Sequence, residues 1–95
     1  MYKSLTEVKR ANAAADQHWF SKDTMSFFES RVLDPLYYGR YFVTSERGPY
    51  ADAEHFYTVR EALPNGHIDT VGEFQAYSTA QEATQAIHEL ARVTA

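Results

Sequence analysis

The sequence predicts a single α+β domain, built as a three-stranded antiparallel meander with helical segments before it and one helix after it, in the order α-α-β-β-β-α. Residues 37–77 contain three runs rich in Tyr, Phe, Val and Thr, separated by two clusters of turn formers. On both sides of this region, a Ser followed three residues later by Glu or Gln marks a helix start. A chain of 95 residues has the length of one domain, which we place over residues 1–95.

The first predicted element is a helix from Leu5 to Gln17. Ser4 and Glu7 form a capping box, in which the hydroxyl accepts an N–H of the first turn and the carboxylate reaches back. After Leu5 and Val8, the apolar residues of this helix are mostly alanines, which favour helix but bury little area. We therefore expect residues 1–17 to be a loosely attached N-terminal helix.

A second, aromatic segment follows, with a short helix over residues 24–30 that Ser21 or Asp23 can cap. The pair Asp34-Pro35 predicts the end of this segment, because the residue before proline avoids helical geometry. Large aromatic side chains are mostly buried, so the rings of this segment are expected to cover part of the core. These rings are Trp19, Phe20, Phe27 and Phe28.

The meander contains one loop and one tight turn. The loop Arg47–Glu54 joins the first two strands, and Pro64-Asn65-Gly66 joins the second and third, since Asn and Gly tolerate positive φ. Gly72 inside the third strand predicts a bulge or a close backbone approach. The predicted strands cover residues 39–46, 55–62 and 67–75.

The last predicted helix opens at Ser78-Thr79-Ala80-Gln81, a second capping-box pattern. Apolar residues then recur at three- and four-residue spacing and form one stripe along the helix. The members of this stripe are Ala83, Ala86, Ile87, Leu90 and Ala91.

Side chains alternate along a strand, so the residues of each sheet face can be read from the sequence. Neither face is polar throughout, and this leaves two explanations open. In the first, the N-terminal segments cover one face and the C-terminal helix covers the other. In the second, one face is exposed as a partner surface made of Arg40, Phe42, Thr44, Phe56, Thr58 and Arg60.

The hydrophobic core is predicted from the apolar side chains that these elements turn inward. Large-to-alanine changes at buried rings typically cost about 3–5 kcal/mol, so these positions should dominate stability. The predicted core consists of Trp19, Phe27, Phe28, Tyr41, Val43, Val59, Ile68, Phe74, Ile87 and Leu90.

The composition excludes several classes of protein. The chain has no cysteine, so it has neither a disulfide framework nor a cysteine zinc site, and this fits a reducing cytoplasm. It has no apolar run near the roughly 18 residues of a membrane span, and its first residues lack the apolar core of a secretory signal. The net charge of −4 does not favour phosphate backbones, so binding to nucleic acid would need a local basic patch.

No set of residues matches a catalytic or metal-binding signature. The histidines show no HExxH spacing, although His55 and His67 can approach across a hairpin near Asp69. Ser45, Glu54 and His55 flank one loop, but nothing further indicates a nucleophile with an oriented base. We therefore expect no enzymatic activity, no metal and no cofactor.

The order of elements also resembles the layout of double-stranded-RNA-binding domains. That fold contacts phosphates with basic residues that open its last helix. The corresponding residues here are Thr79-Ala80-Gln81-Glu82, which contain no lysine. This mode of RNA binding is therefore not expected.

Four blocks in order resemble a family of small orphan proteins encoded by bacteriophages, plasmids and their bacterial hosts. The blocks are KDTMSFFESRV (22–32), GRYFVTSER (39–47), YTVRE (57–61) and IDTVGEF (68–74), within a resemblance that covers roughly residues 18–90. The resemblance implies a mobile-element setting and a bacterial cytoplasm, without an assigned activity.

The function that we expect is binding to a host protein by a small acidic, non-enzymatic module, for example as an anti-CRISPR-like inhibitor of a host defence complex. The expected contact surface is the loop with Tyr50 at its tip, together with Arg47, Asp52 and Glu54. The alternative is a nucleic-acid-binding accessory protein that uses the sheet face of Arg40, Phe42, Phe56 and Arg60.

Overall fold

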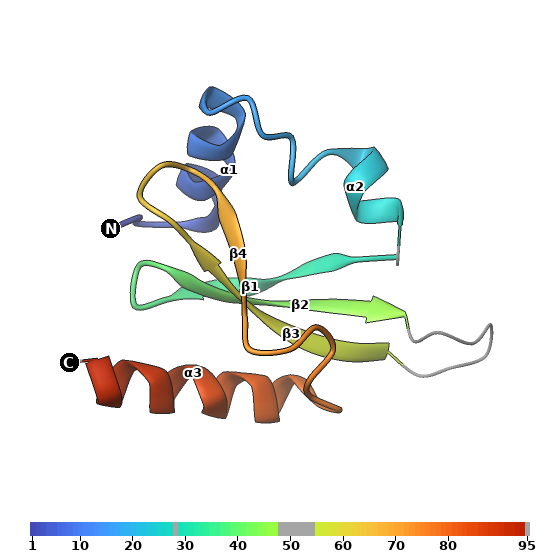
Figure 1. The fold of residues 1–95 in the computed structure, drawn as a ribbon, viewed down its shortest axis with the longest axis vertical. Coiled ribbons are helices and arrows are strands. Elements are labelled where there is room, and N and C mark those ends of the chain that lie inside the picture. The colour runs from blue at the N-terminus through green and yellow to red at the C-terminus, as the bar shows by residue number, and fades with distance from the viewer. Residues whose placement is uncertain (28, 48–54, 95) are drawn as a thin grey trace.

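The computed structural model describes residues 1–27, 29–47 and 55–94. A four-stranded antiparallel sheet lies between two helical layers, with α1 and α2 on one side and α3 on the other (Figure 1). We call these two sides the N-terminal face and the α3 face. The elements are α1 (Leu5–Ala14), α2 (Lys22–Ser26), β1 (Arg31–Tyr37), β2 (Tyr41–Arg47), β3 (His55–Ala62), β4 (Ile68–Val71) and α3 (Ala80–Thr94).

The α+β class, the antiparallel meander and the C-terminal helix are confirmed, but the sheet has four strands and not three. The missed strand is β1, which contains the Asp34-Pro35 pair that predicted only a helix end. β1 lies at the edge of the sheet, where a proline removes no internal ladder bond. Its pairing with β2 is irregular between Leu33 and Tyr37, so the proline interrupts the strand without ending it.

The third predicted strand, over 67–75, is shorter in the structure and ends at Val71. At Gly72 the chain adopts φ +77° and leaves the sheet, and it returns at Tyr77, which exchanges two backbone hydrogen bonds of 2.8 and 3.1 Å with Tyr57. Residues 72–76 therefore form an excursion from the edge of the sheet. Gly72 marks its start, where the sequence had predicted a bulge.

Both faces of the sheet are covered, as the first of the two explanations above expected. On the α3 face, α3 packs against the side chains that alternate inward from β2 and β3. On the N-terminal face, α1 and the Trp19-Phe20 segment pack over Phe42 and Ala62. The buried apolar residues are Tyr41, Val43, Val59, Ala83 and Ile87 on the first face, and Leu5, Val8, Phe42 and Ala62 on the second.

The core prediction is right for β2 and β3 and wrong at two rings. Tyr41, Val43, Val59 and Ile87 are buried, and Trp19, Ile68 and Leu90 are partly buried, whereas Phe28 lies outside the described residues. Phe74 is 42% exposed, because it belongs to the 72–76 excursion, where strand alternation no longer applies. Phe27 is 78% exposed and follows α2, which covers Lys22–Ser26 and not the predicted residues 24–30.

Helix α1 begins at the predicted capping box, where Ser4 Oγ accepts the Glu7 N–H at 3.3 Å, but it ends at Ala14 and not at Gln17. It lies close to the β3–β4 turn. A Cβ on Gly66 would stand 2.4 Å from the Ala11 carbonyl oxygen, which is closer than packed atoms approach. This close approach positions the start of the segment that carries Trp19.

Candidate functional site

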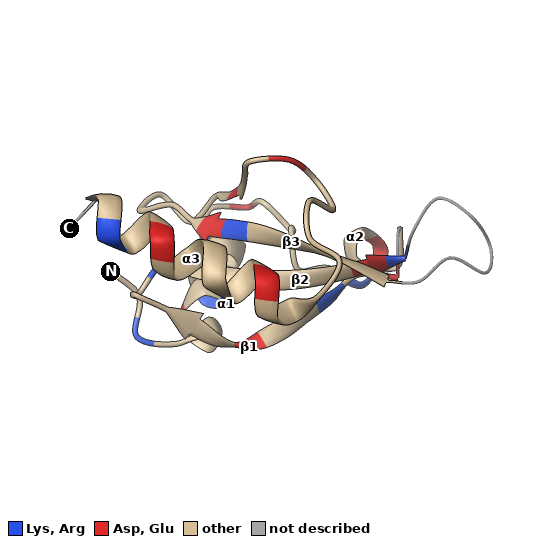
Figure 2. Ribbon diagram, turned by 90° about the horizontal axis from the view of Figure 1, so that it is seen from below, with Lys and Arg blue, Asp and Glu red and all other residues tan. Residues whose placement is uncertain are grey.

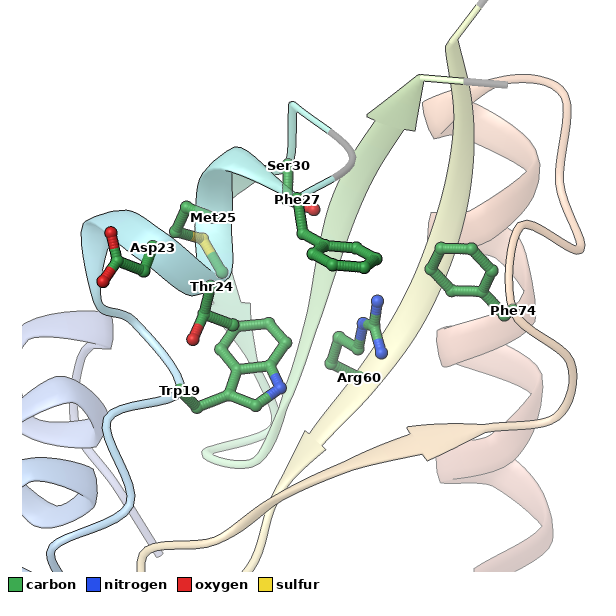
Figure 3. A pocket seen from close by; sticks show the side chains of 8 residues that line it. All are labelled: Trp19, Asp23, Thr24, Met25, Phe27, Ser30, Arg60 and Phe74. Atoms are coloured by element: carbon green, nitrogen blue, oxygen red, sulfur yellow. The ribbon is translucent and has the colours of Figure 1, made fainter. Parts of the chain in front are cut away.

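A pocket of about 470 Å³ opens on the N-terminal face, between α2, the Trp19 segment and the 72–76 excursion. Arg60 of β3 forms its floor, and three aromatic rings surround the guanidinium group (Figure 3). The described lining residues are Trp19, Asp23, Thr24, Met25, Phe27, Ser30, Arg60 and Phe74.

Arg60 is held from below by a buried polar network. Its Nη2 donates to Glu46 Oε1 at 2.8 Å, its Nε donates to Thr44 Oγ1 at 3.1 Å, and its Nη1 donates to Thr70 Oγ1. Thr44 and Thr58 each donate a hydroxyl hydrogen to the carboxylate of Glu46, the latter at 3.0 Å. Alternation along neighbouring antiparallel strands places all of these side chains on one face.

Glu46 is fully buried, and burying a lone carboxylate would cost several kcal/mol. The charge of Arg60 and the two threonine hydroxyls replace the water that this carboxylate loses. Across the described part of the chain, no buried side-chain nitrogen or oxygen lacks a hydrogen-bond partner. The network is therefore complete, and the charge beneath the pocket is balanced.

Two rings cover the guanidinium group from opposite sides (Figure 3). The centroid of Trp19 lies 5.3 Å from Arg60 Cζ, and the centroid of Phe74 lies 5.5 Å from it. Both distances are in the range of cation–π attraction. The floor of the pocket thus combines a cation with aromatic faces.

Each covering segment is fixed by hydrogen bonds to a distant part of the chain. The buried Asn12 of α1 accepts the Trp19 N–H at 2.9 Å and donates to the Gly66 carbonyl, also at 2.9 Å. On the other side of the pocket, the Gln75 N–H donates to Thr58 Oγ1 at 2.8 Å. These contacts hold Trp19 and Gln75, the residue after Phe74, against the sheet before any ligand binds.

The structure divides the residues of the predicted sheet-face site. Phe42 is fully buried beneath Trp19 and Phe20, with ring centroids 5.9 and 6.0 Å away, so it contributes nothing to an exposed surface. Phe56 is partly buried, and Arg60 is 9% exposed and engaged by the network. This correction has a simple cause, since the N-terminal segment and the 72–76 excursion cover the face on which these residues lie.

Arg40 lies at the other end of this face, in the turn before β2. Its Nε is 3.5 Å from Glu61 Oε2, and it donates to the Tyr41 hydroxyl. That hydrogen bond raises the pKa of Arg40 above its usual value, while desolvation opposes the shift. Arg40 therefore stays charged at this end of the sheet, away from the residues that line the pocket.

The predicted loop site is described only at its start. Arg47, the last residue of β2, forms an ion pair with Glu29 at 3.7 Å, and its carbonyl accepts Gln75 Nε2 at 2.8 Å. Tyr50, Asp52 and Glu54 lie outside the described residues. The start of the loop is thus next to the segments that carry Phe27 and Phe74.

The sequence reasoning missed Glu46, Trp19, Phe27 and Phe74 as site residues. A signal for Glu46 was present, because alternation places it on the same strand face as Thr44 and opposite a strand that contributes Arg60. A buried Arg needs a carboxylate partner, and Glu46 is the one within reach. The position of Phe74 had no such signal, because it depends on where β4 ends.

The described residues contain no group of three or more His, Cys, Asp or Glu side chains arranged to hold a metal ion. His55 lies opposite Arg47 in the pairing of β2 with β3, whereas the backbone carbonyl of His67 accepts the Leu63 N–H just beyond the other end of β3. The two histidines therefore lie at opposite ends of β3 and not together. Ser45 is buried. Among the helices of the described chain, none is long and apolar enough to cross a membrane.

The fold defines a small α+β domain whose antiparallel sheet is covered on both faces, with an aromatic pocket above a buried ion pair. The chain belongs to a family of unknown function, DUF7447, whose match extends over residues 4–88. No curated protein and no solved structure matches it. The expectation of an uncharacterised family is confirmed to this extent.

Proposed function

We propose that this protein is a non-enzymatic interaction module that binds a host protein, with the mouth of the pocket above Arg60 at the centre of its contact surface. The observation that carries the proposal is the exposure of Phe27 and Phe74, 78% and 42%, at that mouth. Large aromatic side chains are usually buried, and exposed apolar patches mark interaction sites.

The floor of the pocket is suited to binding because it is rigid. Arg60 is held by three side chains, and Trp19 is held through Asn12. A partner group that enters therefore orders few side chains, which lowers the entropic cost of association. Trp and Arg are also enriched among residues that dominate binding energies. A partner would insert an apolar or aromatic side chain between Phe27 and Phe74.

Arg47, at the start of the loop expected from the sequence, lies beside the same surface. Arg47 adjoins both sides of the pocket through Glu29 and Gln75. Tyr50, Asp52 and Glu54 follow it in the sequence, and an aromatic residue with two carboxylates would add contact area and attraction to a basic patch.

The proposed setting is a bacteriophage or other mobile element in a bacterial cytoplasm, with inhibition of a host defence complex as one specific role. The acidic character of the chain, with a net charge of −4, supports a partner with a basic surface, such as a nucleic-acid channel. Association with such a surface should weaken as salt screens the charges.

The alternative, binding of nucleic acid to the sheet face, has less support. Phe42 is buried and cannot stack on a base, and the charge of Arg60 is balanced by Glu46. Binding to phosphates depends on cations that can replace condensed counterions. Nuclease treatment in the test below separates the two classes.

The test is a pull-down from bacterial host lysate with and without nuclease, followed by affinity measurement with the purified partner. The variants are Phe27→Ala and Phe74→Ala, and the control is Tyr38→Ala, a 48% exposed aromatic residue that does not line the pocket. We expect the control to bind like the wild type and each pocket variant to lose about 2 kcal/mol, roughly thirtyfold in affinity.

Circular dichroism and thermal melting establish that each variant is folded. Capture of a protein that both pocket variants retain would contradict the proposal, as would capture that disappears after nuclease treatment.

A further inference from the structure

A second recess lies on the α3 face, where the sheet is wider than its cover. A helix is about 10 Å across and strands are about 4.8 Å apart, so one helix covers about two strands. Helix α3 packs over β2 and β3, the two central strands. The edge strand β4 therefore extends beyond the helix, and a groove of about 640 Å³ runs between them.

The floor and walls of this groove are apolar. Val71 at the end of β4 and Tyr77 contribute one side, while Ala86, Leu90 and Val93 of α3 contribute the other. Val93 is 85% exposed, which is a large apolar exposure on a helix whose Ala83, Ile87 and Leu90 pack in the core of this face. An exposed apolar residue at the edge of an apolar groove is characteristic of an interaction surface.

The rim of the groove is acidic. Glu82 and Glu89 line it from α3, seven residues or two turns apart, and both are exposed. Figure 2 shows the two acidic positions of α3 on the same side of the helix. No Lys or Arg is present among the described residues that line the groove. The groove thus combines an apolar centre with negative charge at its edge.

We propose that this groove binds a basic amphipathic helix of a partner protein. The apolar side chains of the partner helix would lie in the groove, and its Lys or Arg side chains would lie beside Glu82 and Glu89. The lining residues of α3 extend from Glu82 to Val93, which corresponds to about 16 Å or three helical turns. This length matches a helix that presents apolar residues at positions i, i+3 or i+4, and i+7.

Two other occupants fit the groove less well. An added β-strand would pair with the edge of β4, but this strand has only four residues, and the Asp69 carboxylate already accepts the Thr70 N–H at 2.9 Å. A second copy of α3 would place its own Glu82 and Glu89 beside the same acidic rim, and the like charges would repel. A basic helix avoids both problems.

The inference is independent of the proposed function, because the groove and the aromatic pocket lie on opposite faces of the sheet. The probe is a labelled synthetic peptide of about 18 residues with Leu at helical spacing and Lys elsewhere, and its matched control has Glu in place of Lys. Binding is measured by fluorescence anisotropy at about 0.15 M salt, where long-range attraction is screened. We expect the Lys peptide to bind and the Glu peptide not to bind.

The variants separate the groove from general attraction to an acidic protein. The double variant Glu82→Gln with Glu89→Gln should lower the affinity for the Lys peptide by about fivefold or more. The control pair, Glu7→Gln with Asp16→Asn, removes the same formal charge from the α1 side and should change binding less than twofold. Val93→Ser should also weaken binding, because it removes apolar area from the groove.

Equal weakening by the two charge pairs would overturn the proposal, and so would absence of binding by the Lys peptide. A dimer found by light scattering that Val93→Ser dissociates, without peptide binding, would assign the groove to a second copy instead. Phe74→Ala should leave peptide binding unchanged, so that failure here and failure of the pocket proposal remain distinguishable.

Discussion

The two faces of the sheet are buried by different chemistry, although their side chains alternate along the same strands. On the α3 face, one helix covers an interior of aliphatic and tyrosine side chains, including Val43, Val59 and Ile87. On the N-terminal face, the interior contains the charged pair Glu46 and Arg60. Separate segments cover this second face, among them α1, the Trp19 segment and the 72–76 excursion.

The difference shows how each face acquires an opening. Apolar burial depends mainly on area, so one straight helix is enough to cover the centre of a sheet. The helix is narrower than the sheet, and the groove beside β4 lies where the helix no longer covers it. A buried ion pair needs every hydrogen bond in place, and Thr44, Thr58 and Thr70 of the strands provide these bonds while separate segments cover the pair. The pocket above Arg60 remains where these segments do not meet.

The largest effect is expected from breaking the ion pair on the N-terminal face. Glu46→Leu leaves the Arg60 guanidinium buried without its carboxylate and should lower the free energy of unfolding by about 3–5 kcal/mol in urea titrations. The double variant Glu46→Leu with Arg60→Met should recover much of this loss, because it removes both charges. A double variant no more stable than the single one would mean that the pair is not the critical contact.

The matching change on the α3 face is Ile87→Ala, at a fully buried residue of α3. Loss of aliphatic packing should cost about 3 kcal/mol by the same urea measurement. No second substitution comparable to Arg60→Met is expected to compensate, since no buried charge is left behind. The control on the same helix is Val93→Ala, which should change stability by less than about 0.5 kcal/mol. Equal costs at Ile87 and Val93 would contradict the assigned packing of α3.

A pair of glycines tests how closely α1 packs on the sheet. Gly66 and Gly72 both have positive φ, +87° and +77°, so alanine is strained at either position. Only at Gly66 would the added Cβ meet backbone, whereas nothing lies within 4 Å of a Cβ at Gly72. We expect Gly66→Ala to cost about 1–2 kcal/mol more than Gly72→Ala.

The readout for these glycine variants is thermal melting together with the fluorescence of Trp19, the only tryptophan of the chain. Because Asn12 of α1 fixes both Gly66 and Trp19, displacement of α1 should change this emission in Gly66→Ala alone. The same emission change in Gly72→Ala would indicate that α1 is not the cause.

The smallest effect on stability is expected at the mouth of the pocket. Phe27→Ala removes a ring that is 78% exposed, so the free energy of unfolding should change by less than about 0.5 kcal/mol. Partner affinity should nevertheless fall, as proposed above. A loss of several kcal/mol in stability would show that Phe27 serves the core and not the surface.

Much of the fold could be predicted from short-range patterns. The helix start at Ser4 follows from a side chain that accepts a nearby N–H group, and the last helix starts in the same way, although its cap is Thr79, whose Oγ1 accepts the Glu82 N–H at 3.1 Å, one residue after the predicted Ser78. Alternation also assigned Phe42 and Arg60 correctly to one face of the sheet. What it left open was whether that face is covered, because the covering segments are far away in the sequence.

The sequence by itself determined the features that depend on neighbouring residues: the caps, the Pro64-Asn65-Gly66 turn, the strand faces and the apolar stripe of α3. Only the tertiary structure decided that residues 31–37 form an edge strand, and that Phe74 leaves the sheet to lie over Arg60. The physical reason is that both outcomes depend on contacts across the fold. β1 is a strand because β2 offers its edge, and Phe74 is placed by the bond from Gln75 to Thr58, seventeen residues earlier in the chain.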